Sequence, residues 1–195
     1  MKKIFKGLAV FEIILAAVAI IGGIVIWGGD HSVSSKNIPS DKVLFSNFYK
    51  ILLVKVSDAD NTFASFDSAR TKGNQLKAAK IALNIKDQMR ERWNDIDTLE
   101  LPKLQNLKAS KDLKTLKDFI SACYLYKQMM VEDYLNAVKN PNTYTVAKFQ
   151  NDTEKSDKYL LAGTAEVLQV CTDLSMTDAE IKNMENESKQ IPALN

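Results

Sequence analysis

The chain has 195 residues, of which 26 are basic and 24 are acidic, giving a formal charge of +2. That charge belongs to the first 29 residues, where three lysines stand against one acid, Glu12, so the rest of the chain carries 23 basic and 23 acidic residues. A neutral body offers no basic field to nucleic acid, and we expect no nucleic-acid partner. The length allows one domain of ordinary size plus an appendage.

The appendage comes first: residues 8–29 are apolar apart from Glu12. A helix of this length covers about 33 Å, enough to cross a bilayer core of about 30 Å. Lysines at positions 2, 3 and 6 precede it, and Trp27 and Asp30 stand at its far end, which predicts a cytoplasmic leader at 1–7 and residues 30–195 outside. A cleaved secretory signal is the alternative, but its apolar core is usually shorter and ends in a small-x-small site. We therefore expect a single-pass anchor in the cell membrane of a bacterial envelope protein.

Glu12 requires an explanation, because a carboxylate within an apolar membrane helix costs a few kcal/mol. One interpretation places it near the cytoplasmic end, where it reaches the headgroups. In the other, the run Lys6-Gly7-Leu8-Ala9-Val10-Phe11-Glu12 and the uncharged stretch to position 27 resemble the leader of a type IV prepilin. The resemblance implies cleavage after Gly7, a new N-terminus at Leu8, and docking of Glu12 on the free amine of a neighbouring subunit. It covers residues 2–27, and positions 9–11 depart from the family's usual residues.

Three small residues are candidates for close helix packing. Ala19 and Gly23 form a small-xxx-small pair in the predicted anchor. Gly163 lies inside a predicted helix, where it costs about 1 kcal/mol relative to alanine. We expect another helix to approach closely at Gly163, or the helix to kink there.

The body is predicted to be all-α. Residues 30–40 are polar and contain Pro39, as expected of a linker. Apolar spacing predicts four long helices at 41–72, 75–99, 111–139 and 146–174, with Ser40, Asn74 and Ser110 as N-caps. A capping-box pattern at 177–180 predicts a short final helix, and 191–195 reads as a frayed tail. Short connections make neighbours antiparallel, so residues 41–190 are expected to form an up-down-up-down four-helix bundle.

Few residues are candidates for catalysis or for binding a metal ion. His31 is the sole histidine, so the body has no histidine metal site and no Ser–His dyad. Asp58-Ala59-Asp60-Asn61 resembles the start of a calcium loop, but the later glycine and glutamate of that loop are missing. No phosphate loop or nucleophile elbow is present. We expect no cofactor, no metal and no enzymatic activity.

The two cysteines are expected to be buried thiols. With antiparallel helices joined by a 140–145 loop, Cys123 comes level with residues 162–164, about 12 Å along the axis from Cys171. That separation disfavours a disulfide. The sequence as a whole predicts a non-enzymatic, membrane-anchored protein whose outer bundle binds a protein partner, a small ligand or a second copy, with a pilin-like subunit as the alternative.

Overall fold

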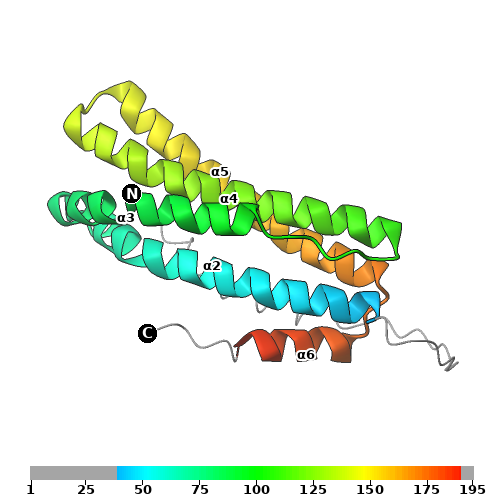
Figure 1. Ribbon diagram of the computed structural model, residues 1–195. Coiled ribbons are helices and arrows are strands. Elements are labelled where there is room, and N and C mark those ends of the chain that lie inside the picture. Colours follow the sequence, from blue (N-terminus) through cyan, green and yellow to red (C-terminus); the bar gives the residue numbers. More distant parts are fainter. Residues whose placement is uncertain (1–38, 190–195) are drawn as a thin grey trace, which may run out of the picture.

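The computed structural model describes residues 39–189. The predicted leader, the anchor at 8–29, most of the linker and the tail at 190–195 lie outside these residues. Five helices follow one another: α2 (Asp41–Thr71), α3 (Gln75–Asp97), α4 (Leu107–Lys139), α5 (Thr143–Asp173) and α6 (Asp178–Lys189) (Figure 1). No strand occurs in the described part, so the prediction of an all-helical body is confirmed.

Several helices begin where the sequence predicted. The Ser40 side chain accepts from the Val43 amide, and Asn74 Oδ1 accepts from the Lys77 amide at 3.1 Å. At α6 the amide of Thr177 donates to Glu180 Oε2 at 2.7 Å and the amide of Glu180 donates to Thr177 Oγ1 at 3.3 Å, so the predicted capping box is present. Side-chain caps of this kind satisfy amides that no helical carbonyl can reach, which is why the sequence marks them.

The third predicted helix begins earlier than expected, and the prediction of Ser110 as its cap is wrong. Asn106 caps α4 instead, with Oδ1 accepting from the amides of Lys108 and Ala109. The backbone amide of Asn106 donates to the carboxylate of Asp41, at the start of α2, at 2.8 Å. This contact spans 65 residues, so local sequence carries no sign of it.

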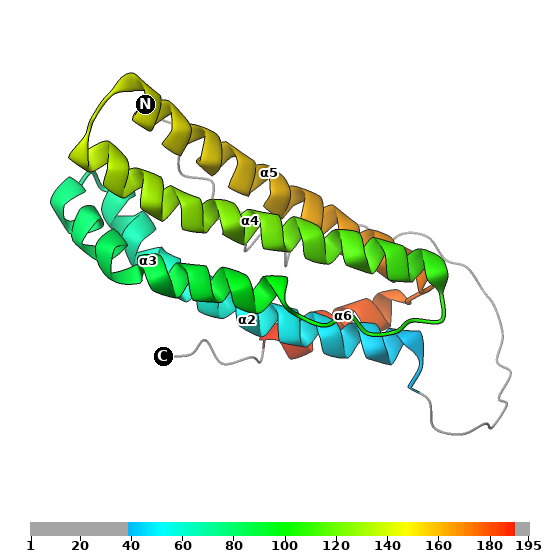
Figure 2. The ribbon, with the colours of Figure 1, turned by 45° about the horizontal axis from the view of Figure 1, so that its top comes forward.

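Successive helices run in opposite directions along one long axis (Figures 1 and 2). The closely packed neighbours among the long helices are α2 with α3, α3 with α4, and α4 with α5. Because α3 is shorter than its neighbours, residues 98–106 continue as an irregular segment beside the start of α2, where Leu104 is buried. Helix α6 then turns back and lies along α2, running in the same direction as α2 (Figure 1).

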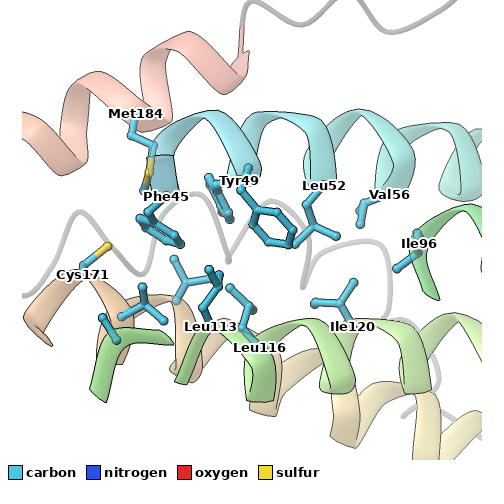
Figure 3. Close-up of a cluster of buried hydrophobic side chains, with 14 of the residues drawn as sticks. Phe45, Tyr49, Leu52, Val56, Ile96, Leu113, Leu116, Ile120, Cys171 and Met184 are labelled. Atoms are coloured by element: carbon cyan, nitrogen blue, oxygen red, sulfur yellow. The ribbon is translucent and has the colours of Figure 1, made fainter. Parts of the chain in front are cut away.

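Two apolar clusters form the core. The larger joins α2, α4, α5 and α6, and Figure 3 shows Phe45, Tyr49 and Leu52 of α2 facing Leu113 and Leu116 of α4. The smaller lies at the other end, among α2, α3 and α4. None of the described helices has the length and apolar content to cross a membrane.

Candidate functional site

An apolar groove lies between α2 and α5, with α4 as its floor. It is a narrow crevice of about 40 Å³, because most of the side chains that line it are buried. Its lining is almost entirely apolar and comes from Tyr49, Leu52, Leu53, Val56, Leu116, Ile120, Leu160, Gly163, Thr164 and Val167. We call this feature the α2/α5 groove.

The groove exists because α2 and α5 are not close-packed partners. Each packs its backbone closely against another long helix, α2 against α3 and α5 against α4. Between α2 and α5 only side chains of the larger core cluster meet. Leu161, which follows the lining residue Leu160 in α5, is 66% exposed, so exposed apolar surface lies close to the groove. Exposed apolar surface close to a groove is typical of a binding site.

Gly163 shapes the floor of the groove. A Cβ at this position would lie 2.6 Å from Cδ1 of Ile120 and 3.2 Å from its Cγ1. Only glycine therefore lets α5 lie this close to α4 while Ile120 keeps its present rotamer. The same isoleucine lines the groove, so the glycine sets how far that side chain projects into it.

The two ends of the groove differ. Towards the start of α2 it meets α6, whose Met184 is buried near Phe45 (Figure 3). Towards the other end, the face of α2 that carries Leu53 and Val56 continues to Asp60, one turn after Val56. Asp60 is paired with Lys127 of α4, so the apolar lining is replaced there by a partly buried ion pair.

This pair forms a polar layer between the two core clusters. The Lys127 ammonium donates to Asp60 Oδ1 and lies 4.5 Å from the ring centroid of Tyr124. Burial alone would lower the pKa of Lys127, but Asp60, Asp67 and Cys123 together outweigh burial, so the pKa is raised and the lysine stays charged. Burial, together with the charge of Asp60, raises the pKa of Tyr124 well above its usual value. The layer is thus a fixed ion pair under an aromatic ring.

A second buried polar group lies between α4 and α5, nearer their connecting loop. Asp133 is 5% exposed and Asp152 is 1% exposed. Lys148 Nζ donates to Asp133 Oδ1 at 2.8 Å, while Oδ2 of each aspartate has no hydrogen-bond partner. Burial, reinforced by the neighbouring Asp133, raises the pKa of Asp152 to about 6. Asp152 therefore binds or releases its proton in a pH range close to neutrality.

The cysteines are both buried and are not bridged. The Sγ of Cys123 lies 3.5 Å from Oγ of Ser156, and burial raises the pKa of this thiol. The register predicted for Cys123, level with residues 162–164, is wrong. The connection between α4 and α5 is shorter than the expected 140–145 loop, because α5 begins at Thr143 under an Asn142 cap.

Of the residues singled out from sequence, only Gly163 contributes to this site. Gly7, Leu8, Glu12, Ala19 and Gly23 lie outside the described residues. Within residues 39–189 no group of three or more histidine, cysteine or acidic side chains is arranged to hold a metal ion.

The polar positions of α5 were missed. Its middle was expected to fray or bend, yet Asp152 and Ser156 are buried in a continuous helix. Their spacing of four residues, one turn before Leu160, is the helical rhythm that would have marked them as inward-facing.

Comparison with known proteins suggests no function, so a proposal of function rests on the structural features described above. No family model, no curated protein and no solved structure matches the chain.

Proposed function

We propose that this protein is a non-enzymatic, membrane-anchored binding module of the bacterial envelope. In this proposal residues 8–29 hold the chain in the membrane as a single span, the N-terminus is cytoplasmic, and the helical bundle lies outside. The bundle binds an apolar segment of a protein partner in the α2/α5 groove. The observation that supports binding is the groove itself, which is lined almost entirely by apolar residues and lies close to the exposed Leu161.

The dimensions of the groove favour a peptide segment. On α2 the lining runs from Tyr49 to Val56, and on α5 from Leu160 to Val167, which is two helical turns on each side. The open space, about 40 Å³, takes the end of one apolar side chain, and neighbouring side chains of the same segment, three or four residues away, would pack on the wall beside it. Polar groups that would orient a small polar substrate are few, since Thr164 Oγ1 already donates to the Leu160 carbonyl.

Site-specific photocross-linking in cells tests the proposal on the full chain. A benzophenone amino acid replaces Leu161 at the rim, and in a matched strain it replaces Ile51, which is 51% exposed and projects from a different face of α2 than Leu53 does. We expect one adduct of defined mass from position 161 and none from 51. Leu53→Glu should abolish this adduct and Ile51→Glu should not. An adduct that survives Leu53→Glu refutes binding in the groove.

The pilin-like alternative rests on the run from Lys6 to Glu12. Its test is the mass of the mature N-terminus. A start at Leu8 supports prepilin processing, with Glu12 as the assembly acid, whereas an intact start at residue 1 or 2 supports the anchor. A start beyond residue 20 would mean a cleaved secretory signal and would refute both.

A further inference from the structure

A larger hollow, separate from the α2/α5 groove, lies beside the turn that joins α2 to α3 (Figures 1 and 2). It has a volume of about 620 Å³ and is open to solvent on one side. Its lining comes from the last turns of α2 and the first turns of α3, namely Ala64, Ser65, Ser68, Ala69, Lys72, Asn74, Lys77 and Ile81. The volume is within the range of small-molecule sites in proteins. We call this feature the α2/α3 hollow.

The hollow exists because this face of α2 carries small side chains. The pairs 64–65 and 68–69, one helical turn apart, each consist of one alanine and one serine, so no long side chain at these positions fills the space beside α3. Ala69 is buried in the smaller core cluster, and Ile81 packs against the same cluster. The hollow therefore has an apolar floor and a polar, exposed rim.

The turn beside the hollow is fixed by Gly73, whose φ is +73°. The amide of Gly73 donates to the Arg70 carbonyl, and the amide of Asn74 donates to the Ala69 carbonyl, both at 3.0 Å. These two bonds form a Schellman motif, which ends α2 and satisfies carbonyls that the helix leaves free. The motif holds the end of α2 and the start of α3 in one arrangement, so the hollow is preformed.

The polar groups of the hollow suit an anion. Lys72 and Lys77 are exposed, and neither forms an ion pair with another residue of the described part. Asn74 Oδ1 accepts from the Lys77 amide at 3.1 Å, which leaves Nδ2 of Asn74 to donate to a ligand. The hydroxyls of Ser65 and Ser68 have no partner among residues 39–189. Because no carboxylate lines the hollow, an anion would meet donors there and no like charge.

The kind of donor favours a phosphate ester over a carboxylate. No arginine lines the hollow, so it lacks the planar fork that recognises carboxylates, whereas lysine binds phosphate as a point charge. A phosphate monoester carries a charge of about −1.5 to −2 at neutral pH, which compensates both Lys72 and Lys77. Helix α3 has no acidic residue in its first turn, so the positive end of its dipole adds to the attraction.

The hollow has room for more than a phosphate group. Beyond the lysines, its walls offer the hydroxyls of Ser65 and Ser68, and its floor offers the methyl groups of Ala69 and Ile81. Hydroxyls and short carbon chains are the groups that a polyol presents to such a lining. We propose that the α2/α3 hollow binds a phosphorylated polyol, such as glycerol phosphate, through Lys72 and Lys77. This site depends neither on the α2/α5 groove nor on the membrane anchor.

Isothermal titration calorimetry on the full chain in nonionic detergent tests this site, with glycerol 3-phosphate as the probe. Lys72→Gln/Lys77→Gln should weaken binding at least about tenfold. Lys80→Gln/Lys86→Gln is the matched control, because it removes the same amount of charge at positions outside the lining, and it should leave the affinity unchanged. Ser68→Leu keeps both lysines but fills the space, so it should abolish binding. No saturable binding, equal weakening by the two lysine pairs, or undiminished binding by Ser68→Leu would overturn the proposal.

Further probes in the same assay separate the parts of the ligand and its source. Glycerol should not bind, and inorganic phosphate should bind more weakly than glycerol 3-phosphate. Equal affinity for inorganic phosphate and glycerol 3-phosphate would overturn the polyol part of the proposal. A short-chain phosphatidic acid presents the same phosphate and glycerol as a lipid headgroup. Weaker binding of this lipid than of glycerol 3-phosphate supports a soluble ligand, and tighter binding that Lys72→Gln/Lys77→Gln removes supports a headgroup at the same site.

Discussion

The contact between Gly163 and Ile120 gives a quantitative test of how the groove is built. In Gly163→Ala the new Cβ would lie 2.6 Å from Ile120 Cδ1, closer than carbon atoms approach. Relief of this overlap costs about 1–3 kcal/mol in a packed core. The alanine also gains about 1 kcal/mol of helix propensity over glycine. We therefore expect a net loss of stability of about 0–2 kcal/mol, with Ile120 turned further into the groove.

The second variant removes the atom that the alanine would meet. Ile120→Val deletes Cδ1 and by itself should cost about 0.5–1.5 kcal/mol. In the double variant only Cγ1 remains near the alanine, at 3.2 Å, a distance that a small shift accommodates. The double variant should therefore be about as stable as the original chain. The two substitutions are then coupled by about 1–3 kcal/mol in the favourable direction.

The assay is urea unfolding of the full chain in nonionic detergent, followed by circular dichroism, with all four members of the cycle measured together. Leu161→Ala lies on the exposed side of α5, and its combination with Ile120→Val serves as the additive control. If Gly163→Ala and Ile120→Val also add to within about 0.5 kcal/mol, the close approach inferred at Gly163 is refuted.

Three further predictions concern the buried polar groups. Asp152 has a folded pKa of about 6, above the value near 3.9 of an unfolded aspartate, so its stabilising contribution is complete at low pH and is lost as pH rises through 6. Asp152→Asn should accordingly raise the free energy of unfolding by about 1–3 kcal/mol at pH 8 and by little at pH 4, and a gain that is equal at both values contradicts this assignment. Lys127→Met leaves the partly buried Asp60 without its partner and should cost about 1–3 kcal/mol in urea unfolding, more than the double variant Asp60→Asn/Lys127→Met, and equal costs would show that the pair is not coupled. Finally, Cys123 and Cys171 should both resist a water-soluble thiol reagent in the folded chain and react, two thiols per chain, in urea, whereas rapid reaction without urea would show that they are accessible.

The long helices could be predicted because their determinants are local. Apolar spacing of three and four residues marked all four, and Ser40 and Asn74 cap their helices within three residues of sequence. Where the start of a helix depended on a distant group, prediction failed. Asn106 begins α4 in a segment that Asp41 holds from 65 residues away, and Ser110, the local candidate, lies inside the helix.

The candidate site could not be predicted from the sequence, for the same reason. The spacing of apolar residues assigns a residue to the inner face of its helix. The spacing does not show which residue of a neighbouring helix that residue will contact. Gly163 could be singled out because glycine has a low helix propensity. Its contact with Ile120, however, depends on the register of α5 against α4. The pairing of Asp60 with Lys127 likewise joins residues 67 positions apart.

The sequence by itself thus determined the all-helical class, the extent of most helices and the division into an apolar N-terminal segment and a charge-balanced body, because each depends on composition or on neighbours within a few residues. Only the tertiary structure decided the register of α4 and α5, the pairing of Asp60 with Lys127, and the opening between α2 and α5. These features arise from helices packing against one another, and packing is set by the shapes of side chains that meet only after the chain has folded.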